Sequence, residues 1–190
     1  MLEILNRLDT EAFLWLNAQN NAWLDPVMYW VSDREIWFPF YAVILFWLGW
    51  TYRLRALAIA LTIGVSVAIG DQVTSSFFKP TFMRLRPCHE PAIDQWVHLV
   101  WECGGQYGFA SSHAANSFGF ATVLTLLLGQ SQPWVRLLYV WAIVISYSRI
   151  YVGAHYPLDV LAGAGIGVLG ASLSVSGYRF FENQYHFKSL

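Results

Sequence analysis

Long apolar stretches separated by short polar segments dominate the chain from residue 36 onward. Three of the five stretches carry no charge, the second contains Asp71, and the fourth contains Arg136 and Arg149 near its ends. A helix needs about 17–25 predominantly apolar residues to cross the hydrocarbon core of a bilayer. The pattern therefore predicts an all-α, polytopic integral membrane helix bundle with about five or six spans. The five stretches cover residues 36–52, 56–78, 114–128, 134–152 and 160–178.

Residues 1–35 follow a different pattern, because charged side chains interrupt the apolar ones throughout. The uncharged run at 12–24 contains four Asn or Gln residues and is too short to span a membrane. We interpret this region as amphipathic helices on the membrane surface, with a tilted first span as the alternative. The whole chain, 1–190, then forms one membrane domain, with a transmembrane core at 36–178.

Composition supports a membrane protein and excludes several other classes. Of the 190 residues, 56% are hydrophobic and 12% are charged, whereas about a quarter of residues are charged in soluble domains. The ten Trp and ten Tyr suit the aromatic belts at membrane–water boundaries. The net charge of -1 and the lack of a basic tail argue against a nucleic-acid partner.

The last apolar stretch contains glycines at short intervals. Small residues four apart on a helix allow close helix packing in lipid, so we expect this stretch to pack against a neighbouring span. The glycines are Gly163, Gly165, Gly167 and Gly170.

Three polar motifs stand at the ends of apolar stretches. The third contains Ser148-Arg149, five residues, His155, three residues and Asp159. His155 and Asp159 are four apart, so on a helix they share a face and the carboxylate can reach the ring. A charged cluster at such a depth is costly to bury, which indicates function. The first motif is Lys79, six residues, Arg86-Pro87, and the second is Ser111-Ser112-His113.

In this order, the motifs resemble the signature of the type-2 phosphatidic acid phosphatase superfamily, which includes lipid phosphate phosphatases, bacterial acid phosphatases and vanadium haloperoxidases. The first and third motifs match in full. The second reads Ala110-Ser111-Ser112-His113 where the family usually has Pro-Ser-Gly-His. The resemblance runs from about Asp71 to Asp159 and implies catalysis without a metal or another cofactor.

The residue types in these motifs suit phosphoryl transfer, which needs charge neutralised on the phosphate oxygens and a nucleophile in line. Three cations form the expected phosphate cage, and hydroxyl or backbone groups of three serines add hydrogen bonds. The cations are Lys79, Arg86 and Arg149, and the serines are Ser111, Ser112 and Ser148.

The two histidines and the carboxylate take the chemical steps. His155 attacks phosphorus as a neutral imidazole and forms a phosphohistidine, while Asp159 holds the ring tautomer. His113 protonates the leaving oxygen and then activates water. The resemblance implies the same roles.

Other polar residues have more ordinary interpretations. We expect Arg84 to contact lipid headgroups, and Asp71 to pair with a motif cation or to bond a neighbouring helix. A metal site formed by His89, Glu90 and His98 is a weak possibility, because the spacing fits no standard zinc pattern.

Loop charges and the two cysteines bear on topology. Discounting the motif cations, the positive-inside rule places one group of basic residues in the cytoplasm and all three motifs on the extracytoplasmic side. Cys88 and Cys103 then lie in an extracytoplasmic loop, where a disulfide is plausible. Gly104, Gly105 and Gly108 are the expected flexible points of that loop. The cytoplasmic group is Arg53, Arg55, Arg136, Arg179 and Lys188.

We therefore predict a phosphatase that hydrolyses a lipid phosphate or pyrophosphate at the outer face of a membrane, such as a bacterial inner membrane. The first choice of substrate is undecaprenyl pyrophosphate, followed by phosphatidylglycerol phosphate, phosphatidic acid and lipid A phosphate. The alternatives are a phosphotransferase that uses the same phosphoenzyme and a non-enzymatic lipid-phosphate binding or transport protein. The oligomeric state is left open.

Overall fold

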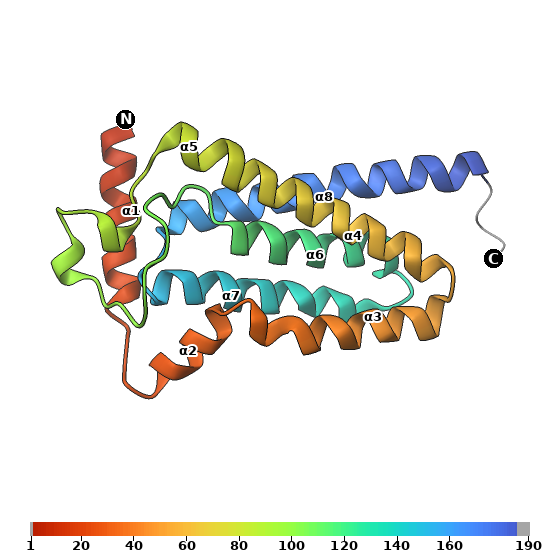
Figure 1. Cartoon of the computed structure of the whole chain (residues 1–190), viewed down its shortest axis with the longest axis horizontal. Helices are drawn as coiled ribbons and strands as arrows, with labels where there is room; N and C mark the ends of the chain where they lie inside the picture. The colour runs from red at the N-terminus through yellow and green to blue at the C-terminus, as the bar shows by residue number, and fades with distance from the viewer. Residues whose placement is uncertain (1, 186–190) are drawn as a thin grey trace.

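A computed structural model describes residues 2–185, and these residues form helices with no strand. Most of the helices run side by side along the molecule, and the first two lie at one end (Figure 1). This arrangement confirms the predicted all-α fold. The helices are α1 (Leu2–Asn17), α2 (Leu24–Ser32), α3 (Phe38–Tyr52), α4 (Arg55–Asp71), α5 (Lys79–Phe82), α6 (Ser112–Leu128), α7 (Leu138–Tyr151) and α8 (Pro157–Tyr185).

Helices α4 and α5 are joined through a π-helical segment, Gln72–Phe78, into one continuous helix. This unit, Arg55–Phe82, and the segment Pro157–Gln184 of α8 are each 28 residues long and apolar enough to cross a membrane. Helices α3, α6 and α7 are shorter, with 15, 17 and 14 residues. The number of spans therefore stays a prediction.

Helix α6 lies at the centre of the bundle and packs against α4, α7 and α8. The closest approach is to α8, at two of its glycines. A Cβ atom on Gly163 would lie 2.2 Å from the carbonyl oxygen of Ser111, and one on Gly167 would lie 2.1 Å from that of Ala115. Only glycine leaves space for the backbone of α6 at these positions, as the sequence predicts.

The other two glycines of α8 differ from each other. A Cβ on Gly170 would lie 3.1 Å from the side chain of Ile69 on α4. Gly165 faces open space, since no atom lies within 4 Å of a Cβ at that position. The predicted helix-packing role is therefore wrong for Gly165.

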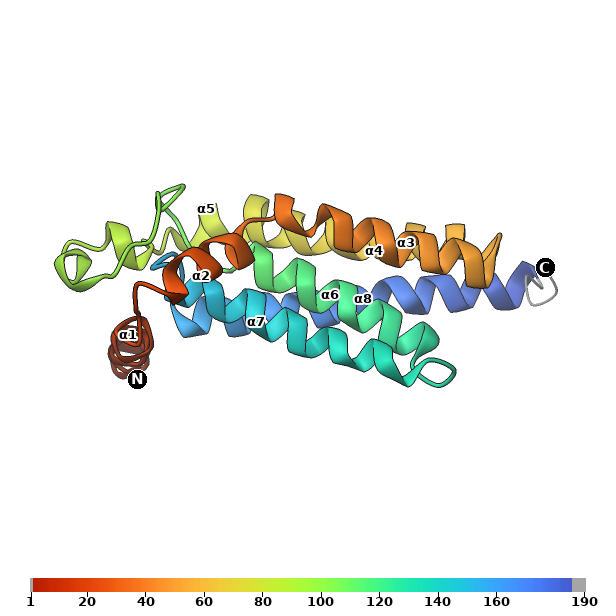
Figure 2. The same ribbon diagram turned by 90° about the horizontal axis from the view of Figure 1, so that it is seen from below.

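Helix α1 crosses the end of the bundle at a steep angle and is seen end-on in Figure 2. It exposes one set of apolar side chains and buries Phe13 and Asp9 against the bundle. Such a two-sided helix suits the predicted position on a membrane surface. The exposed apolar residues include Ile4, Leu5, Leu8 and Trp15.

The ends of the bundle differ in chemistry. The α3–α4 turn, the α6–α7 connection and the last turns of α8 lie at one end, which carries Arg53, Arg55, Arg136 and Arg179 (Figure 1). Lys188 lies outside the described residues. The opposite end holds α5, the start of α6, the end of α7 and the start of α8, so it holds all three motifs.

Candidate active site

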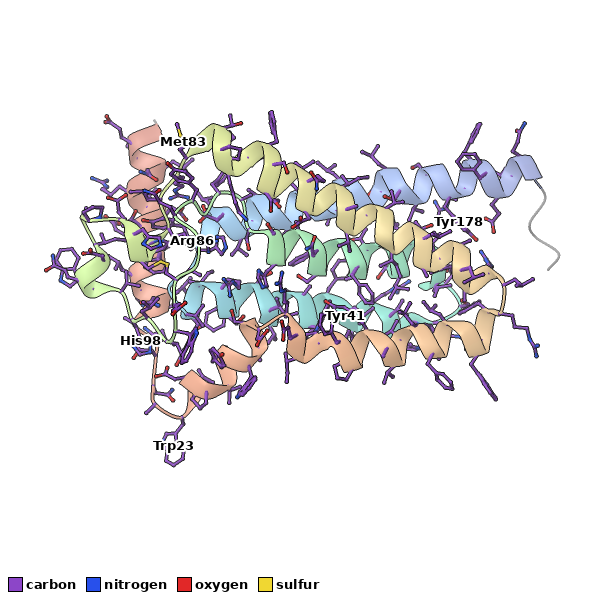
Figure 3. The ribbon with its side chains drawn as sticks, viewed as in Figure 1. Trp23, Tyr41, Met83, Arg86, His98 and Tyr178 are labelled. Atoms are coloured by element: carbon purple, nitrogen blue, oxygen red, sulfur yellow. A yellow bond between two sulfur atoms is a disulfide. The ribbon has the colours of Figure 1, made fainter. Side chains whose placement is uncertain are left out.

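The motif residues converge on this second end of the bundle from four helix ends and two loops. Lys79 begins α5, His113 stands in the first turn of α6, and Arg149 lies in the last turn of α7. His155 occupies the turn between α7 and α8, and Arg86 belongs to the loop after α5 (Figure 3). Residues far apart in sequence thus share one polar cluster at the end of an apolar bundle.

His155 and Asp159 form a buried pair, with 2% and 0% of their side chains exposed. The Nδ1 atom of His155 lies 3.4 Å from Oδ2 of Asp159. The contact predicted from their spacing is present, but His155 precedes α8 and does not share a helix face with Asp159. Instead, Asp159 folds back over the helix start, where it accepts a hydrogen bond from the backbone N–H of Tyr156 at 3.0 Å.

The surroundings of His155 favour a neutral ring. Burial lowers the pKa of His155 well below its ordinary value, and the positive charges of Arg86, Arg149 and Lys79 lower that pKa further. With Nδ1 facing Asp159, the other ring nitrogen, Nε2, lies 3.2 Å from Nη1 of Arg86. With a proton on Nδ1, a neutral imidazole has a free electron pair on Nε2. His155 is therefore in the protonation state that a nucleophile requires.

Gly108 lies against this pair. The backbone of Gly108 raises the pKa of His155, against the larger effect of burial, and a Cβ at Gly108 would lie 3.1 Å from Oδ2 of Asp159. Its N–H donates to the carbonyl of Arg84 at 2.9 Å. The prediction that Gly108 is a flexible point is therefore wrong, because it is a fixed site of close approach. Of the other two loop glycines, Gly104 adopts a positive φ of 77°.

The three motif cations are held by different neighbours. Arg86 is 8% exposed and donates to the carbonyl oxygens of Gly105 at 2.6 Å and Ala154 at 3.1 Å. Nη1 of Arg149 donates to the hydroxyl of Ser32 at the end of α2. The Nε atom of Arg149 is buried without a hydrogen-bond partner among the described residues.

The second motif supplies the remaining contacts to the cluster. The Nζ atom of Lys79 lies 3.0 Å from the hydroxyl of Ser112. Ser112 stands at the position where the family signature has glycine. Ser112 does not adopt a positive φ, so a glycine is not required there. Burial lowers the pKa of His113 well below its ordinary value, and the positive charges of Arg149, Arg86 and Lys79 lower that pKa further. His113 therefore faces the cation cluster.

Two of the three predicted serines direct their hydroxyls into their own helices. Ser111 caps α6, where its Oγ accepts from the N–H of Ala114, and its backbone N–H donates to the carbonyl of Asp159 at 2.9 Å. Ser148 Oγ donates to the carbonyl of Ile145 at 2.7 Å. Both serines are fully buried, so their visible contacts fix helix positions.

Arg84 is paired with two carboxylates of the protein and does not stand free for lipid headgroups, as the sequence analysis expected. Its Nη1 lies 2.8 Å from Asp159 Oδ1, and its Nη2 lies 2.7 Å from Asp9 Oδ2. The guanidinium also stacks 4.0 Å above the ring of Tyr156. The headgroup prediction was wrong because two buried carboxylates need a counter-charge.

Asp9 is a site neighbour that the sequence analysis missed. It is 4% exposed, and its Oδ1 accepts from the N–H of Leu158 at 2.9 Å at the start of α8. Burial raises the pKa of Asp9, and the hydrogen bond from Arg84 opposes that rise. The available signal was its spacing of four from Phe13, which places both residues on the buried face of α1.

The remaining polar residues lie away from the predicted arrangements. Asp71 Oδ1 accepts from Ser75 within its own helix at 3.4 Å, and its charge acts on Lys79. His89 contacts the carbonyl of Gly104, whereas His98 contacts Asp25. The suggested histidine metal site does not form, because its two histidines have separate partners.

Cys88 and Cys103 are joined by a disulfide, with their Cα atoms 6.2 Å apart. The bond ties together the loop that carries Arg86 and Gly108. His89 is the third potential metal ligand beside the two sulfurs. The pairing of the cysteines in the membrane-bound protein is a proposal that chemical labelling tests.

We expect neither cysteine to react with an alkylating reagent in non-reduced, denatured protein, and both to react after reduction. In the chain-entropy model, closing a loop of this size stabilises by roughly 3 kcal/mol. Mass spectrometry of the two peptides makes the measurement, with a Cys88→Ser variant as the control for a free Cys103. Labelling of both cysteines without reductant would disprove the bond.

Comparisons with known proteins identify a family. The sequence profile of the PAP2 superfamily matches residues 55–182. The Lipid A 4'-phosphatase of Bacteroides thetaiotaomicron is 38% identical over 177 residues, which cover 91% of this chain and 78% of that protein. The Undecaprenyl-diphosphatase of Sulfolobus acidocaldarius is 32% identical over 171 residues, covering 88% and 77%.

A solved structure shares the fold. The crystal structure of Aquifex aeolicus LpxE superposes with a TM-score of 0.64 and 26% sequence identity, over 87% of this chain and 93% of that one. The superposed part of this chain is therefore longer than the segment that the family profile matches.

Proposed function

Since this chain belongs to the PAP2 superfamily and is a membrane lipid phosphohydrolase, we propose that it removes the phosphate monoester of a lipid A-type glycolipid through a phosphohistidine on His155. The observation that carries the mechanism is the buried, neutral His155, held by Asp159 and directed at Arg86. The cluster lies at one end of the bundle, where a lipid headgroup can reach it.

In the first step, Nε2 of His155 attacks phosphorus and the bond between phosphorus and the lipid oxygen breaks. Arg86, Arg149 and Lys79 neutralise the phosphate oxygens as charge develops. The negative charge of the bound phosphate offsets the neighbouring cations and keeps His113 protonated, so that His113 donates a proton to the departing lipid oxygen. Asp159 stabilises the imidazolium character that the ring acquires, as the carboxylate does in a catalytic triad.

In the second step, water attacks the phosphohistidine. His113, now neutral, takes a proton from the water, and the bond between phosphorus and Nε2 breaks. Inorganic phosphate leaves and both histidines regain their initial protonation states. Atoms and charges balance without a further reactant.

The choice of a glycolipid substrate rests on the relatives. Two Lipid A 4'-phosphatases, from Bacteroides thetaiotaomicron and Porphyromonas gingivalis, are 38% and 34% identical to this chain. Undecaprenyl diphosphate, the first choice from the sequence, is the second candidate. It is favoured by the Sulfolobus relative at 32% identity and by a Putative undecaprenyl-diphosphatase of Escherichia coli at 29%.

We also propose that the site faces the extracytoplasmic side. The four described arginines at the opposite end of the bundle support cytoplasmic placement of that end. Cysteine labelling, described above, supplies independent support if the disulfide is present, because disulfides persist in oxidising compartments.

The test of the proposed function is release of inorganic phosphate by purified protein in detergent. The panel contains a lipid A-type phosphoglycolipid, undecaprenyl diphosphate and phosphatidic acid, each with and without EDTA. We expect release without an added acceptor alcohol, which distinguishes hydrolysis from phosphotransfer. Absence of release from every lipid would refute the proposed function, and activity lost in EDTA and restored by a divalent metal would refute the metal-independent mechanism.

Replacement of His113 by alanine should have an effect that depends on the leaving group. With a lipid alcohol, which needs a proton to depart, we expect kcat to fall by about 10²–10⁴-fold. With an aryl phosphate, whose leaving group needs little protonation, the loss should be much smaller. Steady-state kinetics on both substrates measure the ratio, and equal losses would contradict the general-acid role.

A further inference from the structure

A hollow of about 240 Å³ opens beside the phosphate cage, between the end of α2 and the loop before the second motif. It has room for roughly eight water molecules at liquid density, and hence for one small ring. Its walls mix aromatic, acidic and basic side chains. They include Tyr29, Ser32, Asp33, Trp101, Glu102 and Arg149.

The hollow adjoins the reacting centre through shared residues. Arg149, a cation of the cage, forms one wall, and Ala154, the neighbour of His155, forms another. The carbonyl of Ala154 accepts a hydrogen bond from Arg86, whose Nη1 also faces His155. A group bonded to a phosphate in the cage therefore has a short path into the hollow.

The aromatic wall resembles a platform for a ring. The rings of Tyr29 and Trp101 lie 5.3 Å apart and are tilted by 56° to each other. Trp101 is 63% exposed, and its indole N–H donates no hydrogen bond to any of residues 2–185. An exposed aromatic side chain with a free polar edge combines apolar contact with hydrogen bonding.

The polar wall selects against charged ligands. The carboxylates of Asp33 and Glu102 repel a second phosphate group, while Arg149 repels an amine. Asp33 Oδ1 already accepts from the N–H of Glu35 at 2.8 Å, which leaves Oδ2 available. Glu102 has no hydrogen-bond partner within the described part of the chain. Free carboxylate oxygens are strong acceptors for hydroxyl groups.

A neutral ring with several hydroxyls satisfies both walls. We propose that the hollow binds the sugar ring that carries the scissile phosphate, with Trp101 as the stacking platform and Glu102 as a hydroxyl acceptor. This inference rests on the proposed function, since it concerns the headgroup of the same substrate. It excludes a distal phosphate from the hollow and so favours a phosphoglycolipid over a polyprenyl diphosphate.

The test compares two substrates across three variants. Wild type, Trp101→Ala and Glu102→Gln are assayed on a phosphorylated glucosamine disaccharide lipid and on phosphatidic acid, which has no sugar. Trp96→Ala is the matched control, because Trp96 is 64% exposed on the same loop and does not line the hollow. The readout is kcat/KM for phosphate release on each substrate.

We expect both hollow variants to lose at least about tenfold in kcat/KM on the sugar lipid, a loss of roughly 1.4 kcal/mol, and to keep wild-type activity on phosphatidic acid. The control should match wild type on both. Equal losses on the two substrates, or no loss on either, would overturn the sugar site. A wild-type enzyme that prefers phosphatidic acid would also overturn it and leave the proposed phosphatase function standing.

Discussion

Replacement of His155 by alanine is expected to lower the rate of phosphate release by at least about a thousandfold, because the loss of a catalytic nucleophile typically costs that much or more. The reason is specific to the ring. Nε2 is the nucleophile, and neither Arg86 nor Asp159 can replace it, because Arg86 is a cation and Asp159 is paired with Arg84. The measurement is kcat on the preferred lipid, with phosphohistidine trapping in wild type.

Because His155 is buried, alanine leaves a small cavity, and the folded state of the variant needs its own check. His155→Gln keeps more of the volume and a polar end, and it should be equally inactive. His89→Ala is the matched control, since His89 is exposed and, among residues 2–185, its side chain forms a hydrogen bond with a loop carbonyl alone. Substantial turnover by a well-folded His155 variant would disprove the assignment of His155 as the nucleophile.

Substitution of Gly163 by alanine is expected to damage both stability and activity. The new Cβ would meet the carbonyl oxygen of Ser111 at 2.2 Å, so α6 and α8 must separate. Overpacking of this kind typically costs about 1–3 kcal/mol or more. The backbone hydrogen bond from Ser111 to Asp159 lies at the same crossing. We therefore expect a lower Tm and at least about a tenfold loss of kcat, because a displacement near 1 Å can cost about 10² in rate.

The same helix provides the matched control for this substitution. Gly165→Ala adds an identical methyl group two residues away, where no atom lies within 4 Å. Since alanine favours helix over glycine by about 1 kcal/mol, the control should be neutral or slightly stabilising. Thermal unfolding in detergent and phosphate release make the comparison. Similar Tm values for the two variants would contradict the close packing of α6 on α8.

The sequence predicted those parts of the fold that depend on local pattern. Apolar stretches located the main helices, although the second extends to Phe82, beyond the stretch ending at Phe78. The pattern weakened there because Lys79 and Pro80 resemble a helix end. Pro80 is accommodated because it follows a π-helical segment and sits at the start of a new turn.

The sequence predicted the core of the site because each motif combines local spacing with a known chemistry. It missed Arg84 because the partners of this residue lie 75 positions away in both directions, at Asp9 and Asp159. No local pattern encodes such a pairing. The role of Gly108 was predicted wrongly for a related reason. A glycine close to two others in the sequence suggests mobility, and only the folded structure shows that the Asp159 carboxylate packs against it.

Helix α1 is linked to the catalytic carboxylate through Arg84, which pairs with both Asp9 and Asp159. The family profile starts at residue 55, yet Asp9 pairs with Arg84 and Ser32 accepts a hydrogen bond from Arg149. Asn17 adds hydrogen bonds to the carbonyls of Ile150 and Tyr151 at the end of α7. The leading segment thus supports the active site, and a domain boundary placed at the start of the family profile would divide one catalytic unit in two.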